Sequence, residues 1–355
     1  MILAGDIGGT KVHLALYSFD DGRLQSVREQ KYPASDYPSL EAIVHTFLSL
    51  GTEQRSDIAA ACFGCPGPVR AGRLKLTNLP WVLDVHDLSK ALDIEHIFLI
   101  NDLEANGYGI PELRTESIFT LAQADTAAVG HRGLMSAGTG LGEALLIWDG
   151  KQRHVPIPSE GGHGDFAPRT DREIQLLQYL RRTLNGRISY ERVVSGLGLQ
   201  NVYGFFRDEV HMEEPAWLRD RLATEDRNAV IGQSAESGAS EICVETMNLF
   251  CSVYGAEAGN IALKVLSTGG MYIGGGIAPK ILKLMGNGLF MQAFVDKGRM
   301  RPLLEAMPVR IILDDTCALL GAAAFAEARA SEVSGRSERA ASIAVTGVPA
   351  PTPGS

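Results

Sequence analysis

Apolar positions along the chain follow two periods, and these predict both strands and helices. Ile2, Leu3 and Ala4 lead into a turn at Gly8-Gly9, and Val12, Leu14 and Leu16 then alternate on one face, which predicts a β-hairpin over residues 2–17. Apolar residues at helical spacing between residues 40 and 48 predict a helix that Ser39 caps. The chain therefore opens with a hairpin followed by a helix.

The same periods predict further elements along the rest of the chain. Short apolar runs predict strands over residues 58–63, 96–100, 271–277 and 309–313, and helical spacing predicts helices over residues 171–186, 240–267 and 316–329. A second strand–turn–strand unit over residues 134–148 repeats the design of residues 2–17. This weak repeat predicts two similar lobes, each with a Gly-rich turn. Residues from about 331 to 355 lack periodicity, which predicts a disordered tail without function.

Composition and charge narrow the classes of protein to which the chain can belong. Its 355 residues, 45% apolar and 21% charged, are typical of a globular protein with more than one lobe. The net charge of −9 argues against a nucleic-acid binder, although not against a site for nucleotide phosphates. No apolar run reaches membrane-spanning length, the N-terminus does not resemble a signal peptide, and the five cysteines form no disulfide-like framework. We therefore expect a cytoplasmic protein with no membrane partner.

The turn of the first hairpin, Asp6-Ile7-Gly8-Gly9-Thr10, is a candidate phosphate site. Its backbone N–H groups and the Thr10 hydroxyl suit phosphate oxygens, and Asp6 can hold a water on Mg²⁺. An ordinary hairpin turn explains these residues equally well when they are taken alone.

Two later segments are also rich in glycine. Gly138-Thr139-Gly140-Leu141-Gly142 lies in the second hairpin and matches neither a Walker A loop nor a dinucleotide fingerprint. Two such turns in two lobes favour phosphates clamped in a cleft between them. Gly274-Gly275-Gly276 ends a strand and leaves room for adenine or ribose, although a packing cluster of glycines is the better explanation for it alone.

Polar residues at the end of a strand and in one loop are candidates for chemistry on a hydroxylated ligand. Asp102 follows an apolar strand and can accept the proton of an attacking hydroxyl, while an Asx turn or helix cap at Asn101-Asp102 is at least as good an explanation. Glu160-Gly-Gly-His163 suits hydrogen bonds to a sugar. Cys62-x-x-Cys65 has no second pair at zinc spacing, so buried cysteines in a core strand are the plain explanation.

Taken together and in order, these motifs resemble the bacterial glucokinase family of the enterobacterial type, within the actin/hexokinase/Hsp70 superfamily. The resemblance covers residues 1 to about 328. Its most specific part is the block Glu160-Gly-Gly-His163 followed by Asp165-Phe-Ala-Pro168, whereas the phosphate hairpins are shared across the superfamily. A further matching block runs from Glu191 to Gly198.

The resemblance implies an α/β fold, the two-lobed actin-like ATPase (ribonuclease H-like) fold with an interlobe cleft. It places a small lobe at residues 1–112 with a returning segment at 303–328, and a large lobe at 113–302. The implied activity is ATP-dependent phosphorylation of D-glucose at the 6-hydroxyl, the first step of glycolysis, with ATP and Mg²⁺ as cofactors. A homodimer is the expected assembly.

Site roles follow from the resemblance, position by position. Asp102 is implied as the catalytic base, and the sugar-binding set is Asn101, Asp102, Glu160, His163, Glu191 and, in a Thr-Asn-x-x-Trp stretch, Asn78. The nucleotide-binding set is Asp6, Gly8, Gly9, Thr10, Gly138, Thr139, Gly275 and Gly276. Asp6 is also the expected water-mediated Mg²⁺ partner.

The chain departs from the family pattern in several places. Lys11 stands where some members have Asn, and Cys65-Pro-Gly-Pro68 is closer to a related repressor/kinase group. The cysteine-rich zinc motif of that group is absent from the sequence, and no helix-turn-helix precedes the kinase motifs, so a repressor is not expected. Two alternatives stay open: a kinase for another hexose, such as fructose, mannose or N-acetylmannosamine, and a non-catalytic sugar-sensing or actin-like ATP-binding protein.

Overall fold

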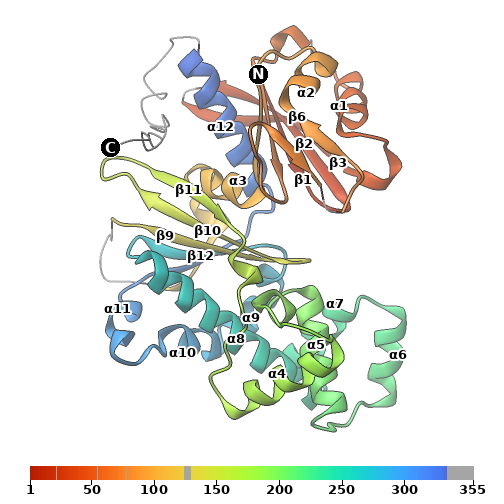
Figure 1. The fold of residues 1–355 in the computed structure, drawn as a ribbon, viewed down its shortest axis with the longest axis vertical. Coiled ribbons are helices and arrows are strands. Elements are labelled where there is room, and N and C mark those ends of the chain that lie inside the picture. Colours follow the sequence, from red (N-terminus) through yellow and green to blue (C-terminus); the bar gives the residue numbers. More distant parts are fainter. Residues whose placement is uncertain (21, 54, 77, 124–128, 334–355) are drawn as a thin grey trace, which may run out of the picture. The chain divides into compact units, whose positions relative to one another are not determined.

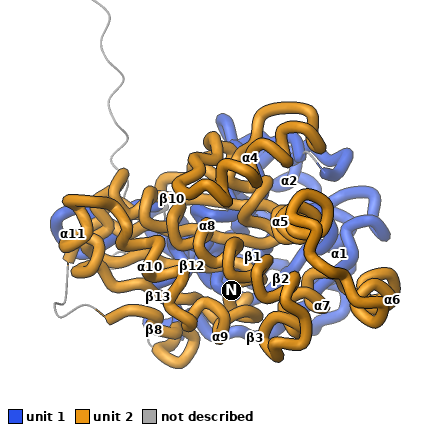
Figure 2. The backbone as a smooth tube through the Cα atoms, turned by 90° about the horizontal axis from the view of Figure 1, so that it is seen from below, with its two compact units in different colours: residues 1–113, 148–156, 316–355 blue, residues 114–147, 157–315 orange. Residues whose placement is uncertain are grey.

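The computed structural model describes residues 1–20, 22–53, 55–76, 78–123 and 129–333. It divides into two compact units, which Figure 2 colours separately: unit 1 comprises residues 1–113, 148–156 and 316–355, and unit 2 comprises residues 114–147 and 157–315. The predicted lobes differ from this division in that residues 148–156 group with unit 1 and the returning segment begins at residue 316 instead of 303.

Unit 1 is built on a five-stranded sheet of order β3-β2-β1-β4-β7, of which Figure 1 labels β1, β2 and β3. β1 and β2 pair antiparallel, which confirms the first hairpin, while β1, β4 and β7 run parallel. The strands are β1 Ile2–Ile7, β2 Lys11–Asp20, β3 Arg23–Pro33, β4 Ala60–Cys65 and β7 Ile97–Asn101, beside a small pair of β5 Arg73–Lys75 and β6 Val82–Asp84. Parallel pairing brings the carboxyl ends of β1, β4 and β7 to one edge of the sheet.

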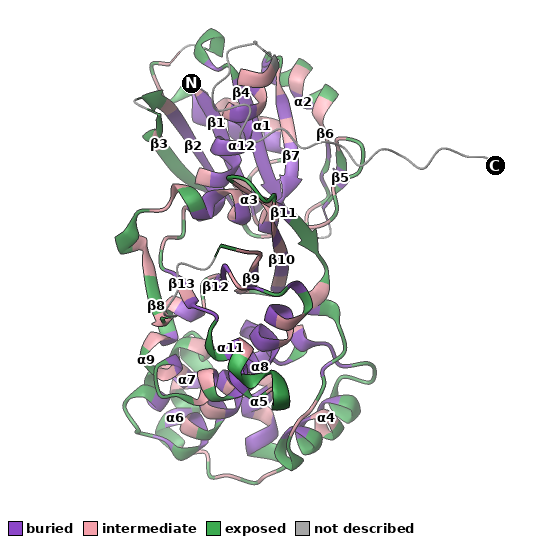
Figure 3. Cartoon of the chain, turned by 90° about the vertical axis from the view of Figure 1, so that its left-hand side faces the viewer, coloured by how far each residue is buried: buried purple, intermediate pink, exposed green. Residues whose placement is uncertain are grey.

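Helices cover both faces of this sheet. Leu3 and Ile7 of β1 pack in one apolar cluster with α1 (Leu40–Ser49) and α2 (Val85–Leu92), whereas Ile2 and Ala4 pack on the opposite side with α12 (Cys317–Val333). α3 (Asp102–Gly109) joins α12, and the inner strands are accordingly buried in Figure 3, in contrast to the largely exposed β3. Ser39 caps α1 as predicted, because its hydroxyl accepts a hydrogen bond from Ala42 N.

Unit 2 contains most of a six-stranded sheet of order β11-β10-β9-β12-β13-β8. β9 and β10 pair antiparallel and confirm the second hairpin, and β12 runs parallel to β9 and β13. The strands are β8 Ile118–Ala122, β9 Arg132–Ala137, β10 Leu141–Trp148, β11 His154–Ser159, β12 Gly270–Gly274 and β13 Val309–Ile312. The helices are α4 Asp171–Thr183, α5 Gly196–Asp208, α6 Ala216–Thr224, α7 Arg227–Glu236, α8 Glu241–Val265, α9 Leu282–Met285, α10 Leu289–Val295 and α11 Arg301–Glu305.

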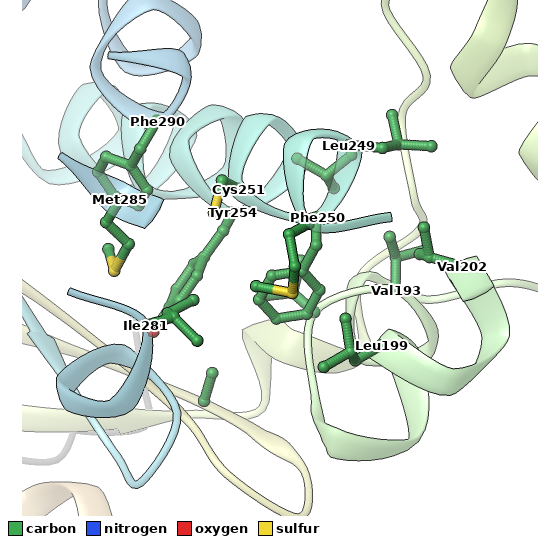
Figure 4. Close-up of a cluster of buried hydrophobic side chains, with 14 of the residues drawn as sticks. Val193, Leu199, Val202, Leu249, Phe250, Cys251, Tyr254, Ile281, Met285 and Phe290 are labelled. Carbon is green, nitrogen blue, oxygen red and sulfur yellow. The ribbon is translucent and has the colours of Figure 1, made fainter. Parts of the chain in front are cut away.

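The long helix α8 forms the centre of the unit 2 core. Figure 4 shows Phe250 and Tyr254 of α8 in one apolar cluster with Val193, Leu199 and Ile281. Two glycines of α8 bring its backbone against α10, since a Cβ on Gly255 or Gly259 would collide with backbone carbonyl groups of α10. Close packing therefore explains the small residues that the sequence shows in this helix.

The predicted elements outside the two hairpins are also present, with ends that differ by a few residues. One prediction needs correction: α12 continues to Val333, so a tail without structure does not begin at residue 331. The helix extends because its small apolar residues, such as Ala326 and Ala330, are buried against the unit 1 sheet. Residues 334–355 of the predicted tail lie outside the described residues. Among the helices that the structure describes, none is long and apolar enough to span a membrane.

Candidate functional site

The first hairpin turn in unit 1 is closed by a hydrogen bond from Gly8 N to Lys11 O of 2.8 Å. A Cβ on Gly9 would lie 3.0 Å from Asn78 Nδ2, so Asn78 packs directly on this turn. Thr10 is exposed at the turn, which leaves it on the surface that a phosphate would approach. Asn78, expected near a sugar, thus lies beside the candidate phosphate turn, while Thr77 of the same motif lies outside the described residues.

Asp6 and Asp102 both lie close to the thiol of Cys65. Burial raises the pKa of Cys65 well above its ordinary value, and the carboxylates of Asp102 and Asp6 raise it further. The strand register agrees, because Asp6 is opposite Gly64 and Cys65 is opposite Asn101 in the parallel ladders. The two acidic residues named from the sequence therefore share the carboxyl edge of one sheet.

Asn101 caps α3, as the sequence allowed. Its Oδ1 accepts hydrogen bonds from Leu103 N at 2.9 Å and Glu104 N at 3.3 Å, and Glu104 completes a capping box. Asn101 Nδ2 donates to Gly67 O at 3.3 Å. The cap is therefore real, and it fixes the orientation of the residue that follows.

Asp102 is the first residue of α3 and is half-buried. Its Oδ1 accepts from Leu103 N at 2.9 Å. The positive end of the helix dipole favours the charged form of a carboxylate at this position. Asp102 thus follows the capping residue Asn101 directly and begins α3, and these two neighbours fix its position at the end of β7.

The second hairpin turn in unit 2 is fixed by backbone bonds from two directions. Gly138 N donates to Gly140 O at 2.9 Å, and Gly196 N, at the start of α5, donates to Gly138 O at 2.8 Å. Glu191 joins the turn, because its Oε2 accepts from Leu141 N at 3.0 Å. Thr139 is exposed at the tip.

Three residues of the expected sugar-binding set come together in unit 2. His163 Nε2 lies 3.9 Å from Glu160 Oε2, and His163 Nδ1 lies 3.9 Å from Glu191 Oε1. The imidazole thus stands between two carboxylates, and the side chains of His163 and Glu160 are more than half exposed. We call these three residues the sugar cluster. Two carboxylates and an imidazole together offer several acceptors to neighbouring hydroxyl groups.

The sugar cluster depends on glycines that hold its loop against β10. The loop forms a short 3₁₀ helix, η5 (Gly161–His163). A Cβ on Gly162 would collide with Leu141 O, and a Cβ on Gly161 would collide with the carboxyl group of Glu143. Side chains at these two positions would therefore lift Glu160 and His163 away from the strand.

The third glycine segment lies against the second hairpin. Gly275 has φ +83°, and a Cβ there would collide with the backbone of Ala137. Ile277 N also donates to Ala137 O at 3.2 Å. Packing therefore explains Gly275, as expected for a glycine cluster taken alone. Gly276 is exposed, and a Cβ there would meet nothing within 4 Å, so it leaves open space beside the turn.

Two buried acids near the sugar cluster were not found from the sequence. Glu143 of β10 is 4% exposed and Glu257 of α8 is 1% exposed. The available signal was a charged residue flanked by small or apolar residues, namely Glu143 in β10 and Glu257 in α8. Such a residue indicates a buried polar contact only when its partner is known, and the partners here are far apart in the chain.

The residues that could hold a metal are few. Within the described ranges, no group of three or more His, Cys, Asp or Glu residues is arranged to bind a metal ion. A Mg²⁺ ion held mainly by nucleotide phosphates needs only one or two protein carboxylates. Asp6, half-buried at the end of β1, fits that more limited role.

Comparisons with known proteins show which family the chain resembles. The sequence model of the glucokinase family matches residues 3–329. A glucokinase of Trichormus variabilis is 45% identical over 336 residues, which cover 91% of this chain and 98% of the relative. A glucokinase of Cronobacter sakazakii is 35% identical over 322 residues, covering 91% and 95%. The crystal structure of a glucokinase from an Antarctic psychrotroph aligns with a TM-score of 0.76 at 31% identity, covering 92% of this chain and 98% of that one.

The two sheets with their glycine-turn hairpins, and the match to solved sugar kinases, define an α/β protein of the actin-like ATPase fold. The chain belongs to the glucokinase family. The predicted family, the fold and the enzyme class, a kinase that phosphorylates glucose with ATP, are thereby confirmed.

Proposed function

We propose that this enzyme transfers the γ-phosphoryl group of ATP to the 6-hydroxyl of glucose, with Asp102 as the general base. The hydroxyl oxygen forms a bond to the γ-phosphorus, the bond from that phosphorus to the β–γ bridging oxygen breaks, and ADP leaves. The proton of the hydroxyl passes to Asp102. The observation that carries the proposal is the sugar cluster, since carboxylates on both sides of an imidazole suit a polyhydroxylated ligand.

The sugar would be bound through hydroxyl groups that donate to Glu160 and Glu191 and accept from His163. The side chains of Glu160 and His163 are more than half exposed and that of Glu191 is 27% exposed, so a ligand can reach them. Asn101 and Asn78 complete the proposed set, and Asn101 would contribute its amide, since Oδ1 is engaged in the helix cap. The proposed role of Asn78 includes the phosphate turn on which it packs.

Asp102 suits the role of base because of its place in the fold. It lies at the carboxyl edge of a parallel sheet, where α/β proteins bind ligands. The helix dipole favours the carboxylate form, which is the form that accepts a proton. A general base at this point raises kcat, because its interaction with the proton strengthens as the oxygen attacks.

The phosphates would be held by the turns of both hairpins, through Gly8, Gly9, Thr10, Gly138 and Thr139, with Gly275 and Gly276 on the adenosine side. Phosphoryl transfer depends mainly on positioning and on offsetting charge, and backbone N–H groups supply both. Mg²⁺, when bound with the nucleotide, would offset phosphate charge, and Asp6 would hold one of its waters. We also propose a cytoplasmic location and a homodimeric assembly. Sedimentation of the purified protein tests the assembly.

The decisive assay is ATP-dependent formation of glucose 6-phosphate by the purified protein. A panel of glucose, fructose, mannose and N-acetylmannosamine at equal concentrations separates glucose kinase from the alternative hexose kinases. We expect kcat/KM for glucose to exceed the other values by at least about tenfold. Equal values for fructose or mannose would remove the glucose assignment, and no turnover of any sugar would favour a sugar-sensing protein.

A further inference from the structure

A buried carboxyl group lies directly beneath the sugar-binding loop. Glu143 comes from the middle of β10, is 4% exposed, and packs against Gly161 so closely that a Cβ on this glycine would collide with Glu143 Oε2. The N–H of Gly161 donates to Ser159 Oγ at 3.0 Å. The loop that carries Glu160 and His163 therefore rests on the Glu143 carboxyl group.

This carboxyl group has little to compensate for its burial. Within the described part of the chain, Glu143 Oε1 has no hydrogen-bond partner. Burial raises the pKa of Glu143 to about 7, the nearby carboxylate of Glu257 raises it too, and Lys264 opposes the shift. Glu143 is thus poised to change charge near neutral pH, beneath residues proposed to bind the substrate.

Glu257 connects the same buried layer to the other part of the sugar cluster. Its Oε2 accepts from Asn260 Nδ2 at 2.8 Å, and Asn260 Nδ2 lies 3.1 Å from the hydroxyl oxygen of Tyr190. Tyr190 opens the 3₁₀ helix η6 (Tyr190–Arg192), which carries Glu191, and Tyr190 N donates to Gly164 O at 3.0 Å. The buried layer therefore backs both segments that supply the sugar cluster.

We propose that Glu143 is a positioning residue for the sugar site: its uncharged carboxyl group supports the Gly161–Gly162 turn, and its ionisation loosens that turn and weakens glucose binding. The inference rests on the proposed sugar cluster. Two carboxylates in a buried layer repel each other, and one of them can relieve the repulsion by moving toward water. For Glu143 that movement displaces Gly161, and with it Glu160 and His163.

Other groups that titrate or carry charge lie around Glu143 and its neighbour Glu257, and the experiment must separate them. They come from every side of the buried layer: Glu257 and Lys264 on α8, Tyr190 on η6, Lys297 before α11, and Glu160 and His163 on the loop. Lys264 Nζ lies 3.7 Å from Glu257 Oε1, and Lys297 Nζ donates to Asn260 Oδ1 at 2.8 Å. Lys264 and Lys297 contact Glu257 and its partner Asn260, which favours Glu257 as the charged member and Glu143 as the neutral one, although burial raises the pKa of Glu257 as well.

The test is the pH dependence of glucose binding, measured by titration calorimetry between pH 6 and 9 without nucleotide. For the wild type we expect the Kd for glucose to rise about fivefold as pH increases through 7, with KM following and kcat changing less. Glu143→Gln keeps the uncharged shape, so it should bind glucose at pH 9 as tightly as the wild type does at pH 6.

Two further variants make the result unambiguous. Glu245→Gln, an exposed carboxylate on the same helix as Glu257, should follow the wild-type profile. Glu257→Gln removes the like charge beside Glu143 and should move the midpoint to lower pH; this variant serves equally if Glu143→Gln does not fold. A Glu143→Gln profile equal to the wild-type profile, or an unmoved midpoint in Glu257→Gln, would overturn the inference.

Failure of the inference and failure of the proposed function give different results. If the wild type binds and phosphorylates glucose but Glu143→Gln retains the whole pH dependence, only the positioning role is lost. If the wild type neither binds glucose nor phosphorylates it, the sugar cluster is wrong and the inference falls with it.

Discussion

Glu191 lies on the second hairpin turn: its Oε2 accepts a hydrogen bond from Leu141 N at 3.0 Å, while its Oε1 is 3.9 Å from His163 Nδ1. One carboxylate therefore joins a glycine-rich turn, proposed for phosphate, to the sugar cluster. This contact explains why the residue at position 140 is glycine, because a Cβ there would lie 2.5 Å from Glu191 Oε2.

Replacing Gly140 should weaken sugar binding specifically. Gly140→Ala would push Glu191 away from Leu141 N and His163, so we expect KM for glucose to rise about tenfold or more, with a smaller change in KM for ATP. The measurement is steady-state kinetics with each substrate varied in turn.

Gly232→Ala is the matched control for that change. Gly232 lies within α7, and a Cβ there would meet nothing within 4 Å. Alanine should leave KM unchanged and stabilise the helix by up to about 1 kcal/mol. A normal KM for glucose in Gly140→Ala would contradict the assignment of Glu191 to the sugar site.

The buried carboxyl group of Glu143 should make stability depend on pH. The pKa of this carboxyl group is about 7 in the folded protein, against the ordinary glutamate value of 4.5 that applies to the unfolded chain. As pH rises, the unfolded chain therefore loses the proton at a lower pH than the folded protein does. Stability is therefore lost between pH 4.5 and about 7, and the loss persists at higher pH. Glu143→Gln should restore up to about 3 kcal/mol of unfolding free energy at pH 8 and little near pH 4.5.

Urea titrations at both pH values measure this difference. Glu245→Gln again serves as the control, since its carboxylate is exposed. An equal gain from Glu143→Gln at both pH values would mean that a change in packing, and not proton binding, is responsible.

The cysteines of β4 should be unreactive while the protein is folded. Cys62 and Cys65 are buried, and burial raises the pKa of each thiol well above its ordinary value, so little thiolate is present. Iodoacetamide at pH 8 should leave both unmodified in the native protein and modify all five cysteines in urea, as mass spectrometry can show. Rapid native modification of Cys65 would revive a redox role for the Cys-x-x-Cys motif.

The sequence predicted those parts of the fold that depend on local pattern. Both hairpins followed from apolar segments on either side of a Gly/Thr turn, and the cap of α1 followed from Ser39 before an apolar helical stripe. Local pattern could not decide whether Asn101-Asp102 is a helix cap or part of a ligand site. Both roles are filled by polar residues that directly follow a strand. The structure shows that Asn101 is the cap, and it places Asp102 at the edge beside it.

Contacts between distant segments could not be predicted in this way. Asp6 and Asp102 approach the same thiol because β1, β4 and β7 run parallel, and Asn78 packs on Gly9 because a loop returns to the first turn. Glu143 and Glu257 approach each other only in the folded chain, where α8 packs on β9, the strand beside β10. The family resemblance supplied roles for the sugar cluster, and those roles stay predictions until they are measured.

The most direct test of the central claim is the effect of Asp102→Asn on turnover and on glucose binding. The amide keeps the size of the side chain but cannot accept the proton, so kcat for glucose phosphorylation should fall by roughly three orders of magnitude or more. Calorimetry should show glucose binding within about fivefold of the wild type, because the sugar cluster remains intact. A variant with near-normal kcat would contradict the role of Asp102 as the base.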